Sequence, residues 1–167
     1  MAWTNFPTWT VGQVSTASDW NTYVAANMQT LATPPILRVY RNSAFNYVSS
    51  TATIIPYDTV QLDSASGFSV STHLYTCPVA GSYAVTARHS TAFVGVRIYA
   101  AIYHNVSEVS RGWDGQSAGN ISAGTVTDTV PSCSAGDTLA GWYYFGAADA
   151  CQVGTTFTYM SIIKESN

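Results

Sequence analysis

The segment TFTYMSIIK, residues 156–164, decides the fold class. Side chains of a β-strand point alternately to its two faces. Phe157, Tyr159 and Ile163 therefore share one face, and two further apolar residues lie on the other. The segment TLAGWYYF, residues 138–145, is likewise apolar on both faces. A sheet of such strands has to bury both sides, one against a second sheet and one against another copy of the chain. This pattern indicates a structural or binding oligomer.

The composition narrows the class of protein further. A chain of 167 residues forms one domain of ordinary size, with room for a small appendage. Charged residues make up 9%, against about 25% in an average domain. With 47% hydrophobic residues and a net charge of −3, disorder is not expected. Nucleic acid is not an expected partner, because its binding requires a basic face. Nothing in the charge balance predicts a membrane partner.

The N-terminus and the cysteines bear on the compartment. Met1–Asn5 lacks the basic and apolar regions of a signal peptide, so we expect assembly in a cytoplasm. Cys77, Cys133 and Cys151 show no paired spacing. Three reduced, buried thiols are the main interpretation, with a Cys133–Cys151 bridge as the alternative. A zinc site is not expected.

Residues 1–35 differ from the rest and are predicted to form an extended arm and a short helix. Thr16 and Asp19 have capping-box spacing. One helical stripe follows; it consists of Trp20, Val24, Asn27 and Leu31. Pro34-Pro35 ends the helix. So short a helix cannot bury every aromatic residue of this leader, so we expect these residues to anchor the chain to a neighbouring protein. They are Trp3, Phe6, Trp9, Trp20 and Tyr23.

Residues 36–167 are predicted to form an all-β head domain. Short strands are expected near 36–41, 45–48, 52–55, 58–62, 69–76, 82–90, 95–104, 106–112, 123–132, 138–145 and 156–164. Gly, Pro, Asn and Asp at the junctions separate these strands. Strands at this spacing indicate a β-sandwich or jelly roll.

Four segments of the head resemble the tumour-necrosis-factor-like and complement globular-head jelly rolls. They are YTCPVAGSYAV (75–85), AIYHN (101–105), AGDTL (135–139) and TFTYMSII (156–163). Val106 departs from the usual glycine, and so does the Tyr159-Met160 pair. The resemblance covers about residues 36–165 and implies a two-sheet jelly-roll sandwich that forms homotrimers around an axis lined by aromatic residues. The residues expected at that trimer interface are Tyr83, Val85, Phe157 and Tyr159.

The leader has a likeness of its own. WTVGQVSTASDWNTYVAAN, residues 9–27, resembles a segment that recurs in tailed-bacteriophage structural proteins. This resemblance implies a virion protein on the outer surface of a phage particle, assembled in the host cytoplasm. The expected function is a trimeric capsid decoration or head-fibre protein that binds the major capsid protein or another virion protein. The alternative is the receptor-binding tip of a tail fibre or baseplate, with a host glycan or protein as its ligand.

Catalytic and cofactor chemistry is not expected. No recognised catalytic or nucleotide-binding motif occurs, and the three histidines have no acid or nucleophile at a recognised spacing. We therefore interpret the histidines as structural and expect no enzyme, no cofactor and no metal. A calcium site at Asp114 or Asp149, as in some relatives, remains a minor alternative. Trp113, Trp142 and Tyr144 either recognise a sugar or partner at the surface or pack within and between subunits.

Overall fold

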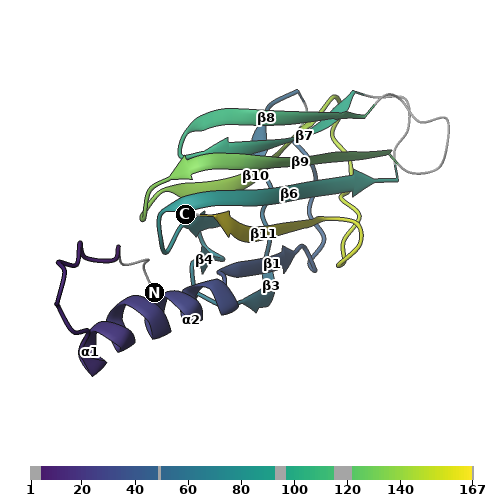
Figure 1. The fold of residues 1–167 in the computed structure, drawn as a ribbon. Helices are drawn as coiled ribbons and strands as arrows, with labels where there is room; N and C mark the ends of the chain where they lie inside the picture. The colour runs from purple at the N-terminus through teal and green to yellow at the C-terminus, as the bar shows by residue number, and fades with distance from the viewer. Residues whose placement is uncertain (1–4, 49, 93–96, 115–121, 167) are drawn as a thin grey trace. The chain divides into compact units, whose positions relative to one another are not determined.

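The computed structural model describes residues 5–48, 50–92, 97–114 and 122–166 (Figure 1). The chain divides into two compact units, one covering residues 1–34 and the other residues 35–166. We call the first unit the leader and the second the head. All residues of the hydrophobic core cluster lie in the head, the first of them being Leu37. The head therefore has a core of its own.

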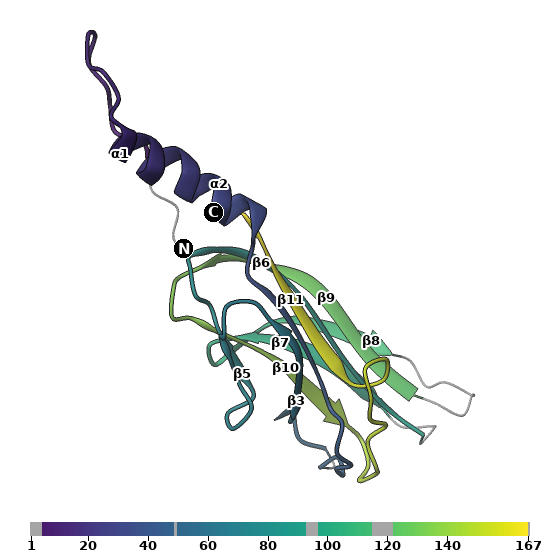
Figure 2. The same ribbon diagram turned by 90° about the horizontal axis from the view of Figure 1, so that it is seen from below.

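The leader contains three consecutive helical segments, which follow one another along one rod in Figures 1 and 2. They are α1 (Ala17–Asp19), the π-helical segment η1 (Trp20–Ala25) and α2 (Ala26–Ala32). The predicted capping box is confirmed, because Asp19 N donates to Thr16 Oγ1 at 3.2 Å and Thr16 N donates to the Asp19 carboxylate at 2.8 Å. Among the described helices, none combines the length and the apolar character that crossing a bilayer requires.

The π-helical segment lies within the predicted stripe. The predicted stripe assumed the α-helical repeat throughout, whereas a π turn is wider because its hydrogen bonds join residues five apart. Trp20, the first residue of that stripe, is 57% exposed. Asn27 Nδ2 donates to the Tyr23 carbonyl at 2.7 Å, so this amide is used within the leader. The stripe therefore stays a prediction.

The head is a sandwich of two antiparallel sheets, so the all-β jelly-roll prediction is confirmed (Figures 1 and 2). The first sheet has the order β3-β1-β11-β6-β9. Its strands are β1 (Ile36–Tyr40), β3 (Thr59–Asp63), β6 (Gly81–Thr91), β9 (Ser122–Cys133) and β11 (Tyr159–Ser166). The second sheet has the order β4-β5-β10-β7-β8, with β2 also paired to β10. Its strands are β2 (Thr53–Ile54), β4 (Phe68–Ser69), β5 (Leu74–Thr76), β7 (Ile98–His104), β8 (Ser107–Asp114) and β10 (Thr138–Phe145).

Two strand predictions are wrong. The strand predicted near 45–48 is a loop that makes one isolated bridge, from Asn46 to Ala150. Its Val48 amide donates to the Tyr143 hydroxyl at 3.1 Å instead of to a backbone carbonyl of a neighbouring strand. The strand predicted at 69–76 is a hairpin of β4 and β5, because the chain reverses at His73, where φ is +60°.

The alternation predicted for the two deciding segments is confirmed. In β11, Met160 and Ile162 are buried, whereas Tyr159 and Ile163 face outward. In β10, Tyr143 is buried and Trp142 is only half-buried. The side chains that face inward from both sheets form one continuous core.

Tyrosines supply much of the volume of that core. Tyr47, Tyr57, Tyr75, Tyr83 and Tyr143 are among its largest fully buried side chains. A buried hydroxyl is costly unless it is hydrogen-bonded. The Tyr47 hydroxyl donates to the Ser90 carbonyl at 2.8 Å, that of Tyr57 to the Tyr159 carbonyl at 3.1 Å, and that of Tyr83 to the Val79 carbonyl at 2.6 Å. The bonds of Tyr47 and Tyr57 tie core rings to the backbone of distant segments, and that of Tyr83 holds the turn just before β6.

The two sheets approach each other most closely between β9 and the β7–β8 pair. A Cβ atom on Gly112 would lie 1.8 Å from the Thr125 carbonyl oxygen. A Cβ atom on Gly124 would lie 2.7 Å from the Ala100 amide nitrogen. Glycine in a strand often marks such a close approach of one backbone to another. These two glycines allow the sandwich to close along this side without intervening side chains.

Two neighbouring tyrosines provide a test of the hydroxyl contribution. The Tyr75 and Tyr83 rings lie 6.3 Å apart, but only the Tyr83 hydroxyl has a partner among the described residues. We expect Tyr83→Phe to lower the free energy of unfolding by about 1 kcal/mol. Tyr75→Phe should leave that free energy unchanged or raise it, because it removes an unsatisfied buried hydroxyl. Urea unfolding at one protein concentration measures both, and equal losses would contradict this assignment.

Candidate binding surfaces

The aromatic residues predicted to anchor the leader are mostly exposed in it. Phe6, Trp9 and Trp20 are 56%, 37% and 57% exposed, and Tyr23 is half-buried. The Phe6 and Tyr23 rings lie 5.8 Å apart, so the extended arm folds back on its own helix. Trp3 lies outside the described residues. The four described rings thus gather in one part of the leader, and their role as an anchor stays a prediction.

These rings surround a small hollow of about 160 Å³. Its lining residues are Phe6, Trp9, Ser15, Asp19, Trp20, Tyr23 and Val24. The Trp20 indole Nε1 donates to Ser15 Oγ at 3.2 Å, which fixes the orientation of that ring. Asp19 is held by the capping box, since its Oδ2 accepts from the Thr16 amide at 2.8 Å and from the Thr16 hydroxyl at 2.7 Å.

Two of the residues predicted at a trimer interface are not available to a partner. Tyr83 and Val85 are fully buried and belong to the core between the two sheets. The prediction is therefore corrected for these two residues. Strand alternation explains the error, because the outward side chains of β6 are those of the other parity. Ala84 and Thr86 lie on that outward side and are half-buried.

The outward side of the first sheet is the second candidate surface, and we call it the β11 face. Its centre is a hollow of about 210 Å³. The outward residues that line it are Ile36, Arg38, Ala84, Thr86, Ser161 and Ile163. Ile163 is 42% exposed in the single chain. Small side chains thus form the floor of this hollow, and isoleucines stand beside them.

Tyr159 and Phe157 extend the β11 face toward the start of β11. The Tyr159 ring is half-buried, with the Arg38 guanidinium carbon 3.6 Å from its centroid. Arg38 also donates to the Ser161 hydroxyl and, at 2.8 Å, to the Thr155 carbonyl. Phe157 is 36% exposed. Both aromatic residues therefore remain candidates for a subunit interface.

The outward side of the second sheet carries stacked aromatic rings. Trp142 stacks on Tyr103 with centroids 4.3 Å apart, and Tyr144 stacks on Tyr99 at 5.0 Å. We call these four residues the aromatic ladder. The Arg111 guanidinium lies 4.3 Å from the Tyr99 centroid, and that of Arg97 lies 5.5 Å from the Tyr144 centroid. Such stacking stabilises both partners.

The aromatic ladder places Trp142 and Tyr144 on one surface, as their spacing predicts. Tyr99 and Tyr103 were not predicted at this surface, although both have the same parity within one strand, β7. Trp113 is paired with Tyr99 in the register of β7 and β8, but its side chain lies outside the described part of the structure. Whether these residues bind a ligand stays a prediction.

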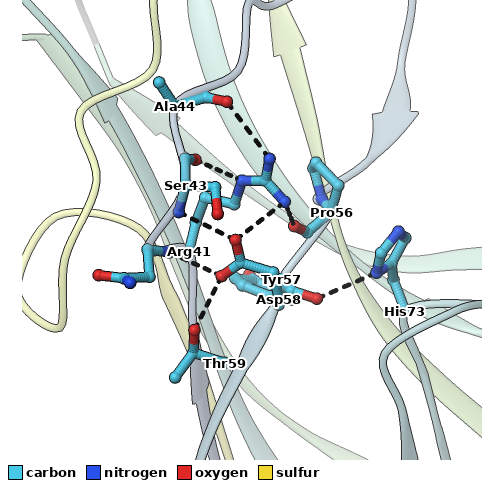
Figure 3. A network of polar contacts seen from close by, with 9 residues as sticks. Arg41, Ser43, Ala44, Pro56, Tyr57, Asp58, Thr59 and His73 are labelled. Carbon is cyan, nitrogen blue, oxygen red and sulfur yellow. Dashed lines mark hydrogen bonds and ion pairs between the residues drawn. The ribbon is translucent and has the colours of Figure 1, made fainter.

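The densest polar cluster has a structural role (Figure 3). Arg41 donates to the carbonyls of Ser43, Pro56 and Ala44 at 2.6, 2.7 and 3.4 Å. It also pairs with Asp58 at 3.3 Å. Burial opposes ionisation of Asp58, but hydrogen bonds from Ser43, Asn42 and Thr59 lower the pKa of its carboxyl to about 2. The donors of Arg41 are used in joining the loop after β1 to the loop before β3.

His104 and Asp137 form a second polar contact, at 2.8 Å. Asp137 also accepts from the Ser134 amide at 2.8 Å and from Asn105 Nδ2 at 3.1 Å. The bond from Ser134 is the larger cause of the low pKa of Asp137, about 2, followed by those from His104 and Asn105. Asp137 therefore holds the turn before β10 and links the β7–β8 turn to the β9–β10 turn.

The cysteines are buried free thiols, so the main prediction is confirmed and the alternative Cys133–Cys151 bridge is not formed. Burial raises the pKa of Cys77 to about 12, and the pKa values of the other two thiols are raised for the same reason. The Cys151 sulfur lies 3.2 Å from both the Tyr47 hydroxyl and the Thr158 hydroxyl. Protonated, buried thiols are poor nucleophiles.

Among the described residues, no group of three or more His, Cys, Asp or Glu side chains could hold a metal ion. The Asp149 carboxylate accepts a hydrogen bond from the Thr91 hydroxyl, and the side chain of Asp114 is outside the description. To a partner, the leader hollow, the β11 face and the aromatic ladder can offer apolar contact, ring stacking and cation–π contact.

Comparison with known proteins places the head in a fold. No family model matches the chain, and no curated protein matches it. The globular domain of zebrafish complement 1qA protein is similar over 81% of this chain and 100% of its own, with a TM-score of 0.62 and 15% identity. Murine APRIL is similar over 80% of this chain and 100% of its own, with a TM-score of 0.63 and 10% identity. Eiger TNF from S. frugiperda gives a TM-score of 0.54 at 13% identity, over 80% of this chain and 94% of its own.

These likenesses confirm the tumour-necrosis-factor-like jelly roll that the four sequence segments predict. At such identities they establish the fold and not the partners, because one fold serves many unrelated functions.

A buried histidine makes the stability of the head depend on pH. His89 is fully buried, with its ring centroid 5.3 Å from that of Tyr47. Its Nε2 donates to the Tyr99 carbonyl at 2.8 Å, and its Nδ1 has no hydrogen-bond partner among the described residues. Burial lowers the pKa of His89 from 6.5 to about 4; the bond to the Tyr99 carbonyl offsets only part of this effect, and the nearby Arg88 charge adds to it.

The unfolded chain therefore binds this proton before the folded chain does. The contribution of His89 is complete above pH 6.5, falls as the pH decreases toward about 4, and is constant below that value. We expect a loss of about 3 kcal/mol over this window. Urea unfolding between about pH 7.5 and pH 4.5 measures it. His89→Gln keeps a donor but cannot titrate, so its stability should vary less; an unchanged pH dependence would contradict the assignment.

Proposed function

We propose that this chain is a non-enzymatic virion protein of a tailed bacteriophage. In this proposal the head associates as a homotrimer, and the leader attaches the trimer to the capsid surface through the major capsid protein or another virion protein. The attached trimers decorate and stabilise the particle. The observation that carries the proposal is the pairing of a separate leader, with exposed aromatic rings, and a head with an uncovered apolar face.

The β11 face supports association of the head. Ile163 and Phe157 stand exposed on it beside the half-buried Tyr159. An obligate interface commonly buries about 2,000 Å² or more and has an apolar centre. A hollow with small side chains at its floor accepts a protruding side chain from a neighbouring copy. Rotational symmetry closes such head-to-tail contacts into a ring. The likeness of the head to the complement and tumour-necrosis-factor folds supports a ring of three copies.

The leader supports the attachment half of the proposal. Three of its aromatic side chains are more than a third exposed, although aromatic side chains gain most from burial. Aromatic residues are enriched where protein partners meet and often dominate the binding energy. The resemblance of residues 9–27 to a phage structural segment makes a virion neighbour our preferred partner.

A second candidate function is recognition of a host surface at the tip of a tail fibre or baseplate. The aromatic ladder favours it, because Trp142 and Tyr144 are half-buried and flanked by Arg97 and Arg111. Aromatic faces with adjacent donors suit sugar rings. The rings of the ladder already stack on one another, which reduces the area left for a ligand, so this candidate ranks second.

Association through the β11 face is tested at Ile163. Ile163→Asp places a charge where water can reach it in the single chain, so folding should persist. In a trimer the same carboxylate would be buried without a partner, which costs several kcal/mol. We expect sedimentation velocity to show a trimer for the unaltered chain and a protomer for the variant.

The control is Val106→Asp, at a position that is 91% exposed and lies between β7 and β8. It should leave the trimer intact. A stable Ile163→Asp trimer would remove the β11 face from the proposed interface, and a monomeric unaltered chain would remove the trimer itself.

Attachment is tested by deleting the leader, residues 1–34. The hydrophobic core cluster of the head lies within residues 35–166, so the shortened chain should fold with an unchanged melting profile. We expect the full chain to bind purified capsids that lack it, in multiples of three copies, and the shortened chain to lose this binding. Binding of the full chain to host cells rather than capsids would favour the second function. Equal capsid binding by both chains would refute an anchoring role for the leader.

A further inference from the structure

We infer that the leader hollow receives a cationic side chain, preferably arginine, from the protein to which the leader attaches. This inference rests on the proposed function, since it takes the leader to be the attaching segment, and it adds the chemistry of the partner. It follows from the size of the hollow, the chemistry of its walls and the position of the one charged side chain in the leader.

The size of the hollow fits a single side chain. Its volume is about 160 Å³, whereas sites for small molecules usually measure roughly 300–1,000 Å³. Four rings surround it, and three of them are more than a third exposed. A side chain of a docking protein can therefore enter without rearrangement of the core of either unit.

The walls suit the stem and the head of a long cationic side chain. The stem of arginine or lysine is a run of methylene groups, which packs well against apolar surface. The guanidinium group of arginine is planar and weakly hydrated, so it stacks on the faces of Trp, Tyr and Phe. Phe6, Trp9, Trp20 and Tyr23 supply all three ring types.

Asp19 selects the charge of the occupant. It lines the hollow, and it is the only charged side chain between residues 1 and 34. Hydrogen bonds from Thr16, first from its amide and then from its hydroxyl, lower the pKa of Asp19, so its carboxyl is ionised at neutral pH. Both bonds go to Oδ2, and Oδ1 has no hydrogen bond among the described residues.

Docking of a protein over the hollow would remove water from this carboxylate. An apolar occupant would leave the charge without a partner, and an anionic occupant would repel it; both outcomes are costly. A guanidinium group supplies the counter-charge and donates hydrogen bonds in a planar fork that matches a carboxylate. Charge complementarity therefore favours arginine over a leucine or phenylalanine side chain, which the hollow could also hold by size.

The test uses the full chain labelled with 5-fluorotryptophan and two short probes. One probe is the capped peptide Gly-Arg-Gly, and the other contains citrulline, which has the shape of arginine without its charge. We expect the fluorine resonances of Trp9 and Trp20, assigned with Trp9→Phe and Trp20→Phe, to shift with the arginine peptide. Half-saturation should need about fivefold less arginine peptide than citrulline peptide.

Two variants separate charge from structure. Asp19→Asn keeps an oxygen for the Thr16 amide but removes the charge, so the preference for arginine should fall below about twofold. Asp19→Glu keeps both the charge and the capping box and should retain the preference. Val14→Ala, at a leader position that is 84% exposed and outside the hollow, should change nothing. Raising the ionic strength of the unaltered protein from about 20 mM to 500 mM should also reduce the preference, because salt screens exposed charges.

Equal binding of the citrulline peptide, or a preference that persists in Asp19→Asn, would overturn the inference. The absence of any shift would overturn it as well. These outcomes are distinct from failure of the proposed function. A leader whose deletion abolishes capsid binding, but whose hollow ignores arginine, would keep the proposed function and reject this chemistry.

Discussion

The head depends on hydrogen bonds between core tyrosine hydroxyls and backbone carbonyl groups. Tyr47, Tyr57 and Tyr83 fill the space between the sheets with their rings. The hydroxyls of Tyr47 and Tyr57 bind carbonyls of distant segments, and that of Tyr83 binds a carbonyl in the turn before its own strand. A phenylalanine core would supply similar burial but would not set the path of those segments. The chain contains 11 tyrosines, and only 9% of its residues are charged. Tyrosine hydroxyls therefore supply polar contacts that ion pairs partly supply in other domains.

Local patterns predicted the fold well wherever strands are long. The alternation in residues 138–145 and 156–164 identified the buried and outward faces. Prediction failed at 45–48, where the backbone bonds to a side chain and to a loop instead of to the backbone of a neighbouring strand. The π-helical segment Trp20–Ala25 was also not predicted, because a sequence does not reveal that a helix will adopt the wider π turn.

The candidate surfaces were harder to predict than the fold. Tyr83 and Val85 were assigned outward because aromatic and apolar residues suggested an interface, whereas the parity of β6 turns them inward. The ladder partners Tyr99 and Tyr103 depend on the register of β7 against β10, which joins segments about forty residues apart in the chain. The leader hollow depends on an arm that folds back on its own helix, which the spacing of the aromatic residues does not encode.

The contact of β9 with β7 and β8 has a further consequence for how this head can change during evolution. At Gly112 and Gly124 one backbone touches another, so any added side chain at that seam pushes the two layers apart. At the opposite border a Cβ on Gly67, just before β4, would also lie 2.7 Å from the Thr76 carbonyl oxygen. The turn that follows β4 is exposed instead, with Val70 at 44%. New loops, and peptides grafted for display, are therefore tolerated far better at that turn than along the seam.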